Sequence, residues 1–367
     1  MFNTMLTRRR TLKIAATAAL GASGLVRYLP VGAASTNRFE LIDITQTDPD
    51  ATNPAWVGAN AMNAAGTVVG NKWISDEKRS PWIFANGRLH RIKTGKFGGL
   101  AAAINDQDVV AGRDLLGWHD AMTPWGQPAL WVDGEKQVLP YPDTLPGPAT
   151  EGRADSINNH GVVAGTVRTE QGAPYPVVWR DGEPALLPSL FEIGTGSATA
   201  INDDGVIVGT VNDEQGDVFG VMWRNDEVAP LWSIPGAEDQ VRVNTIDTGG
   251  IIAGSAWSGD RWDAMVWREG SSQLPDVLPD VLKTQTEAVA LASNGKGLFG
   301  GSAMDALRDQ TAAIWRDGAG IDLNTLVENL GEVRLLVVRA ITANGAIAAS
   351  ARYPDGSIHA VLLQPIS

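Results

Sequence analysis

One short motif recurs seven times along this chain and constrains its fold more than any other feature. In the clearest copy, residues 198–209 read Ala-Thr-Ala-Ile-Asn-Asp-Asp-Gly-Val-Ile-Val-Gly, and a Met-Trp step follows at residues 222–223. The glycine that closes the motif recurs every 42 to 53 residues, at Gly70, Gly112, Gly165, Gly209, Gly254 and Gly301, with Ala349 in the seventh copy. Strand-like repeats of about 40–50 residues are typical of propeller blades.

Each repeat predicts four short strands separated by tight turns. The first strand ends at the Ile-Asn step, where Asn, Asp and Gly residues tolerate positive φ. The second is the Val-Ile-Val-Gly run, in which glycine suits a close backbone approach. The third carries a large apolar residue, at Phe84, Trp131, Trp179, Trp223, Trp267, Trp315 and Leu362. The fourth is a short run that ends near a leucine.

The seventh repeat lacks a fourth strand, because the chain ends soon after residues 362–365. Residues 39–44, Phe-Glu-Leu-Ile-Asp-Ile, precede the first repeat and supply a candidate for the missing strand. An unpaired sheet edge is avoided in natural proteins. We therefore predict an all-β, seven-bladed β-propeller, residues 35–367, closed by an N-terminal strand that completes the last blade. An open β-solenoid is the alternative, and the unequal repeat lengths disfavour it.

The N-terminus predicts export. Residues 7–13 read Thr-Arg-Arg-Arg-Thr-Leu-Lys and precede a weakly apolar stretch at residues 14–26. This segment resembles the twin-arginine signal, with a threonine where phenylalanine is commonest, and an ordinary secretory signal is the alternative. The stretch is too short to span a bilayer. Small residues at 31–33 fit cleavage near residue 34. We expect residues 1–34 to be a signal peptide and the mature protein to be periplasmic or extracellular.

Composition excludes several partners and cofactors. The chain has no Cys, so it has no disulfide and no thiolate metal site. Loss of residues 1–34 removes five basic residues and no acid, which changes the net charge from −13 to −18. Nucleic-acid binding needs clustered Lys and Arg, which this chain lacks, so no nucleic-acid partner and no membrane span are expected. We expect a monomer.

The repeat motif resembles the extracellular repeat family named for its His-Ala-Phe tripeptide (HAF repeats). The Ala-x-x-Ile-Asn-x-x-Gly-x-Val-x-Gly half is well kept at residues 198–209, whereas the tripeptide survives only in relics such as residues 359–361, His-Ala-Val. The opening strand at residues 39–44 is also similar to the one that begins family members. The resemblance implies an exported, propeller-like repeat protein of undefined activity, and it carries no catalytic residues to transfer.

Two aromatic-rich loops between the second and third strands are the candidate binding site. Variable loops on a rigid scaffold are where binding usually takes place. Tryptophan beside Asp and Arg is suited to stacking a sugar ring and hydrogen-bonding its hydroxyls. Tryptophans that pack within their own loops, or a protein contact, would give the same clustering. The candidate ligand-binding residues are Trp118, His119, Asp120 and Trp125 in the second repeat and Trp257, Arg261, Trp262 and Asp263 in the fifth.

Acidic residues recur near the start of the same loops, at Asp114, Asp213, Asp260, Asp305 and Asp355, with Asp76 slightly later. If they converge on the channel mouth, they could hold Ca²⁺ or supply an acid and a base for polysaccharide cleavage. Solvated surface charge is the simpler interpretation. No other catalytic or cofactor motif is present, so no cofactor is predicted and metal binding stays open.

These features predict an exported binding or interaction module rather than an enzyme. The expected ligand is a carbohydrate or another small polar molecule. The alternatives are an envelope hydrolase or lyase that acts on polysaccharide through loop carboxylates, and a scaffold for an envelope protein.

Overall fold

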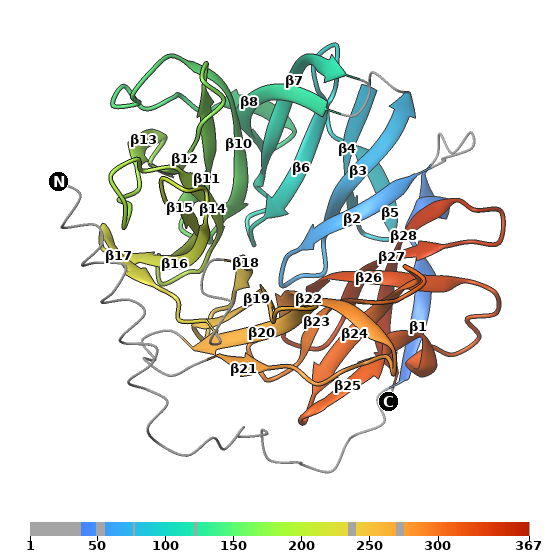
Figure 1. The fold of residues 1–367 in the computed structure, drawn as a ribbon. Coiled ribbons are helices and arrows are strands. Elements are labelled where there is room, and N and C mark those ends of the chain that lie inside the picture. The colour runs from blue at the N-terminus through green and yellow to red at the C-terminus, as the bar shows by residue number, and fades with distance from the viewer. Residues whose placement is uncertain are drawn as a thin grey trace, which may run out of the picture.

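A computed structural model describes residues 38–48, 56–75, 78–120, 123–233, 240–268 and 275–366. Within these ranges the antiparallel sheets stand around a common centre, with the first strand of each repeat innermost (Figure 1). The predicted signal peptide, residues 1–34, and Asp76 lie outside the described residues.

Blades 1 to 4 each contain four strands in chain order. Blade 1 consists of β2 (Val57–Met62), β3 (Val68–Ser75), β4 (Lys78–Ala85) and β5 (Arg88–Arg91). Blade 2 consists of β6 (Gly99–Ile104), β7 (Val110–Asp120), β8 (Thr123–Val132) and β9 (Glu135–Val138). Blade 3 consists of β10 (Ala149–Ile157), β11 (Val163–Thr169), β12 (Pro174–Arg180) and β13 (Glu183–Leu186). Blade 4 consists of β14 (Gly196–Ile201), β15 (Ile207–Asn212), β16 (Val218–Arg224) and β17 (Glu227–Pro230).

Blades 5 and 6 are joined by one parallel pair, Trp262 with Glu287. Blade 5 consists of β18 (Val241–Ile246), β19 (Ile251–Trp257), β20 (Trp262–Arg268) and the short β21 (Asp276–Val277). Blade 6 consists of β22 (Gln285–Ser293), β23 (Phe299–Asp305), β24 (Gln310–Arg316) and β25 (Ala319–Asp322). Blade 7 consists of β26 (Arg334–Ile341), β27 (Ile347–Arg352), β28 (Ile358–Ile366) and β1 (Arg38–Asp43). Two 3-10 helices, η2 (Thr45–Thr47) and η3 (Leu323–Leu326), follow β1 and β25.

The N-terminal strand closes the ring, as the sequence predicts. β1 pairs antiparallel with β28, from Arg38 opposite Ile366 to Asp43 opposite Val361. Phe39 and Ile44 are buried, with 2% and 0% of their surface exposed. The structure confirms the all-β, seven-bladed fold closed in its last blade by the start of the described chain.

The asparagine of the Ile-Asn step joins neighbouring blades as well as capping its own turn. In blade 4, Asn202 Oδ1 accepts a hydrogen bond from the Val206 amide at 2.9 Å, and its Nδ2 donates to the Asp247 carbonyl of blade 5 at 3.2 Å. The same interblade bond runs from Asn63 to Asn105, from Asn105 to Asn158 and from Asn158 to Asn202. The turn chemistry inferred from the sequence explains the hydrogen bonds within each turn but not those to the next blade.

The marker glycine faces a β-bulge in the innermost strand. A side chain on Gly209 would place its Cβ 2.0 Å from the Ser197 carbonyl oxygen, and the equivalent contact at Gly112 is 1.9 Å. In every blade the register of the innermost strand shifts beside this position, as between Ala198 and Ala200. In blades 1 to 6 the glycine is therefore required by close backbone approach, whereas blade 7 has Ala349 opposite its bulge.

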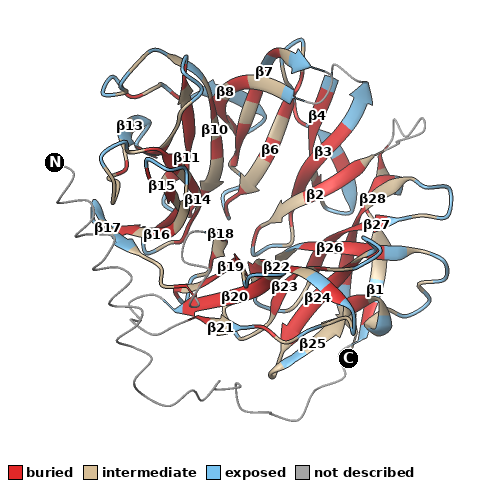
Figure 2. Cartoon of the chain, in the orientation of Figure 1, coloured by how far each residue is buried: buried red, intermediate tan, exposed pale blue. Residues whose placement is uncertain are grey.

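The repeat tryptophans are core residues that also connect blades. Trp223 is 1% exposed, and its Nε1 donates to the Pro188 carbonyl of the preceding blade at 2.6 Å. Four others make the same bond, namely Trp131, Trp179, Trp267 and Trp315. Buried residues run along the strands, whereas exposed residues gather at the loops (Figure 2).

Candidate functional site

The candidates of the second repeat lie in the β7–β8 hairpin of blade 2. The Trp125 indole lies over Gly117, where a Cβ atom added to the glycine would be 2.6 Å from the indole nitrogen. The His119 and Trp125 ring centroids are 6.3 Å apart. Asp120 accepts hydrogen bonds from the Thr123 amide and hydroxyl at 2.8 and 2.9 Å. Asp120 therefore stabilises the hairpin turn.

Trp118 belongs to an aromatic group shared with blade 1. The Arg79 guanidinium lies 4.0 Å from the Trp73 ring centroid and 4.6 Å from that of Trp118. Trp56 extends the group, because its ring centroid is 5.5 Å from that of Trp73. Arg79 is only 4% exposed, and its Nη1 donates to the Ser75 carbonyl at 2.6 Å. We call Trp56, Trp73, Arg79 and Trp118 the blade 1–2 aromatic group.

Two exposed aliphatic residues lie beside this group in the sequence. Ile74 is 42% exposed and Leu116 is 39% exposed. Both occupy β-bulges, between Trp73 and Ser75 and between Leu115 and Gly117. Bulges redirect side chains at strand ends, which accounts for large apolar side chains facing solvent here.

The candidates of the fifth repeat form a separate group in blade 5. Trp257 and Trp262 meet edge to face with centroids 5.8 Å apart, and the Arg242 guanidinium lies 3.8 Å from the Trp262 centroid. Arg261 forms an ion pair with Asp263 at 2.8 Å and a two-pronged pair with Asp280 at 2.9 and 3.0 Å. The hydrogen bond to Asp280 is the main cause that raises the pKa of Arg261 above its ordinary value.

The eight candidates therefore occupy two places rather than one. Blades 3 and 4 separate the two hairpins on one side of the ring, and blades 6, 7 and 1 separate them on the other (Figure 1). In both groups an indole face is covered by a guanidinium. The sequence identified the tryptophans but missed Arg79 and Arg242. These arginines come from other strands, and the residue spacing does not indicate that they stack on the indoles.

Most of the described loop acids have local partners. Asp213 and Asp305 each accept backbone hydrogen bonds from residues two and four positions later, which close their hairpin turns. Asp114 is buried and pairs with Lys136 at 2.6 Å. Asp260 is exposed. Among the described residues, no group of three or more His, Asp or Glu side chains is arranged to hold a metal ion.

A polar network crosses the closure seam in blade 7. His359 Nδ1 is 2.8 Å from Asp43 Oδ2, and His359 Nε2 is 3.0 Å from Ser357 Oγ. The Ser357 hydroxyl also donates to Asp355 at 2.6 Å, and the Tyr353 ring stacks on His359 at 4.0 Å. The distances match those of a Ser-His-Asp triad, but the nearby Asp355 carboxylate opposes negative charge developing on the serine. The network is better suited to holding β1 against β28.

The pH dependence of this seam follows from Asp43. Burial raises the pKa of the Asp43 carboxyl. Hydrogen bonding by His359 and Tyr353, together with the charge of His359, lowers this pKa by more than burial raises it, so it lies below the ordinary value. A carboxyl with a lowered folded-state pKa stabilises the fold above its unfolded pKa of about 3.9, and this contribution is lost as pH falls through the folded value.

We therefore expect Asp43→Asn to lower Tm most at neutral pH. The Tm difference from wild type should stay constant down to about pH 5 and shrink toward pH 3, as measured by differential scanning calorimetry. Asp204→Asn, at an exposed turn position, is the control and should give a small difference at every pH. A Tm difference for Asp43→Asn that does not change between pH 7 and pH 3 would show that the carboxylate charge does not hold the seam.

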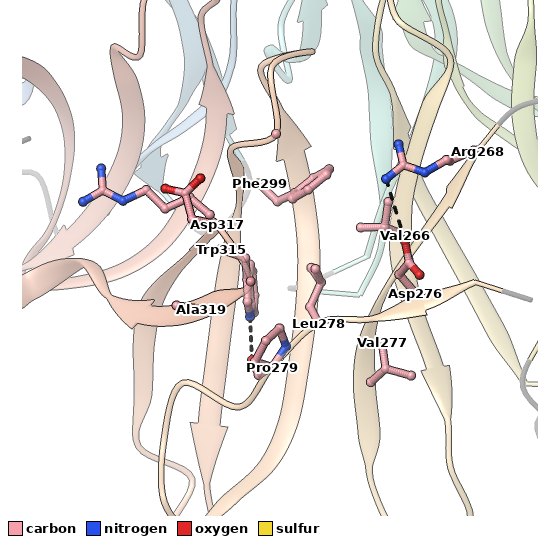
Figure 3. A pocket seen from close by; sticks show the side chains of 13 residues that line it. Val266, Arg268, Asp276, Val277, Leu278, Pro279, Phe299, Trp315, Asp317 and Ala319 are labelled. Carbon is pink, nitrogen blue, oxygen red and sulfur yellow. Dashed lines mark hydrogen bonds and ion pairs between the residues drawn. The ribbon is translucent and has the colours of Figure 1, made fainter. Parts of the chain in front are cut away.

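The cavities formed by the described residues include one between blades 5 and 6, one in a proline-rich loop and one at the closure seam. The one between blades 5 and 6 has about 40 Å³ and is lined by Trp315, Phe299 and Leu278, with the Arg268–Asp276 pair at its rim (Figure 3). Such a volume has room for little more than a water molecule. A second, of about 570 Å³, is lined entirely by residues 141–149 of one proline-rich loop. The third, of about 440 Å³, lies at the closure seam.

The comparisons with known proteins establish the fold alone. No protein-family model and no characterised protein matches the sequence, so the resemblance to the His-Ala-Phe repeat family rests on the motif. A puromycin-hydrolyzing peptidase from Mycobacterium tuberculosis is similar in structure with a TM-score of 0.57 and 10% identity, over 85% of this chain and 52% of that one. A chain of the Mitotic Checkpoint Complex is similar with a TM-score of 0.51 and 13% identity, over 93% of this chain and 96% of that one.

A more distant neighbour is the β-propeller-like TolB from Acinetobacter baumannii, with a TM-score of 0.43 and 13% identity over 84% of this chain and 63% of that one. This chain thus spans about half of the peptidase and less than two thirds of TolB. No helix in the described ranges is both long and apolar enough to cross a membrane.

Proposed function

We propose that this protein is an exported binding module whose contact surface lies at the ends of blades 1 and 2. The observation that carries this proposal is the stacking of Arg79 on both Trp73 and Trp118, together with the exposure of Ile74 and Leu116 in the same two strands as these tryptophans. A rigid Trp and Arg centre next to exposed aliphatic residues has the composition of an interaction hot spot. Export to the periplasm or the cell exterior is part of the proposal and rests on the N-terminal arginine motif.

The geometry favours a protein partner over the carbohydrate expected from the sequence. A sugar ring stacks on an open indole face. Here Arg79 lies over both Trp73 and Trp118, and Arg242 covers a face of Trp262. The surface of blades 1 and 2 instead exposes Trp73, which is 36% exposed, and the aliphatic side chains of Ile74 and Leu116. Apolar and aromatic contact of this kind is typical of the buried centre of a protein interface.

The test compares two matched double variants. Ile74→Ser/Leu116→Ser removes the aliphatic part of the proposed surface, and Val138→Ser/Val277→Ser removes two comparably exposed aliphatic residues from outer strands of blades 2 and 5. Because all four side chains are exposed, both variants should fold. We expect the wild type and the outer-strand variant to capture a specific protein from an envelope extract in equal amounts. With Ile74→Ser/Leu116→Ser, the affinity for that protein should fall at least tenfold, which corresponds to about 1.4 kcal/mol.

Equal capture by both variants would contradict the proposal. Intrinsic tryptophan fluorescence titrated with cell-wall and plant oligosaccharides, with and without Ca²⁺, tests the carbohydrate expectation in parallel. A saturable shift that Trp118→Ala or Trp262→Ala abolishes would restore a sugar as the ligand and overturn the protein assignment.

A further inference from the structure

The cavity at the closure seam has the size and lining of a small-molecule site. Its volume of about 440 Å³ falls within the range usual for ligand pockets. Four apolar side chains form much of its wall: Leu41, Leu330, Val333 and Ile366. The polar lining consists of Glu40, Glu328, Asn329 and Tyr353. Among these lining residues there are two carboxylates and no cationic side chain.

The two carboxylates differ in their partners. Glu328 forms an exposed ion pair with Arg38 at 3.1 Å, and exposed pairs of this kind are weak. Glu40 is exposed on β1, and no ion pair of its carboxylate occurs among the described residues. Because Arg38 offsets the charge of Glu328, the net negative charge of the cavity comes from Glu40, in a chain whose net charge is −13.

Tyr353 gives the cavity a fixed aromatic wall. Its ring stacks on that of His359, with the two ring centroids 4.0 Å apart. Burial is the main cause that raises the pKa of the Tyr353 phenol, and Asp43 raises it further, so the group stays neutral. His359 is itself held by Asp43 and Ser357. An aromatic ring whose position is fixed before binding lowers the entropic cost of stacking a ligand on it.

We propose that this cavity binds an organic cation, namely an amine or quaternary ammonium group that carries an apolar body. The carboxylates attract the charge, the face of the Tyr353 ring that His359 does not cover offers a cation–π contact, and the aliphatic wall receives the apolar body. This site belongs to blade 7 and is independent of the surface proposed for blades 1 and 2. Its occupant would contact both β1 and the β27–β28 hairpin, so binding would also reinforce ring closure.

Paired probes that differ only in charge test the proposal on the mature wild-type protein. Choline is compared with its neutral isostere 3,3-dimethylbutan-1-ol, and cadaverine with pentan-1-ol, by isothermal titration calorimetry and by the rise in Tm. We expect the cations to bind and raise Tm, with affinity falling as salt is added, and the neutral probes to bind at least fivefold more weakly.

Variants locate the site. Glu40→Gln should weaken cation binding about two- to fivefold, whereas Glu227→Gln, the same change on the outer strand of blade 4, should leave it unchanged. Tyr353→Phe keeps the ring and should retain most of the binding, and Tyr353→Leu should lose it. Equal binding of charged and neutral probes, equal effects of the two Glu→Gln variants, or no binding by either cation would overturn the proposal.

Discussion

Trp223→Ala should destabilise the folded protein by about 3–5 kcal/mol, the range for truncating a fully buried large side chain. Trp223 is 1% exposed and packs in the core between blades 3 and 4, with Ile207, Val221 and Ala164 among its cluster. The substitution also removes the hydrogen bond to the Pro188 carbonyl, so that a backbone acceptor at the blade junction loses its donor. Equilibrium denaturation in urea gives the free energy of unfolding directly.

Trp223→Phe separates the two contributions. It keeps most of the buried ring and deletes the indole N–H, so we expect a smaller loss, of about 1–3 kcal/mol, that reflects the unsatisfied carbonyl. Val138→Ser, at an exposed position, should change the free energy of unfolding by less than about 0.5 kcal/mol. A loss near zero for Trp223→Ala would mean that the repeat tryptophan does not hold neighbouring blades together.

Deletion of residues 36–45 should cause the second large loss, because it removes the whole closing strand. β28 would then expose an unpaired edge, and the buried side chains of Phe39 and Ile44 would leave the core of blade 7 and its junction with blade 1. Each of these side chains alone is worth about 2–5 kcal/mol. We expect the deletion to lower Tm strongly and to promote aggregation through the exposed edge.

A peptide supplied in trans distinguishes loss of closure from general damage. A peptide of residues 36–48 in excess should bind the deletion variant and restore much of its Tm, because the partner strand β28 is intact. The same peptide with Phe39→Ala and Ile44→Ala is the control and should restore little. Unchanged thermal stability of the deletion variant, or equal rescue by both peptides, would contradict the closure account.

The fold was predictable because the same physical constraint recurs in every blade. Gly209 and its equivalents mark a bulge that brings a carbonyl within 1.9–2.1 Å of a missing Cβ, and the Asp-Gly turns after the third strand adopt positive φ, as at Asp133 and Asp317. Residues 39–44 were predictable as the closing strand because only one candidate precedes the first repeat. Because these weak local patterns recur at the same position of each repeat, together they predict where each strand begins and ends.

The contacts between blades were harder to predict. Asn202 and Trp223 each bond to a carbonyl about 35 to 45 residues away, and the identity of an accepting carbonyl leaves no trace in the sequence. The same limit applies to the candidate site. Trp118 and Trp262 stood out as loop aromatics, but the arginines that stack on them come from other strands, and only the folded ring shows that the two hairpins lie apart.

The measurement that tests the account most directly is site-specific photocrosslinking of the exported protein in living cells. A photoreactive phenylalanine analogue replaces Ile74 in one strain and Val138, a comparably exposed aliphatic residue on the outer strand of blade 2, in the other. The account predicts a discrete crosslinked protein adduct at position 74 and none at position 138. An adduct at both positions, at position 138 alone or at neither would contradict a binding surface at the ends of blades 1 and 2.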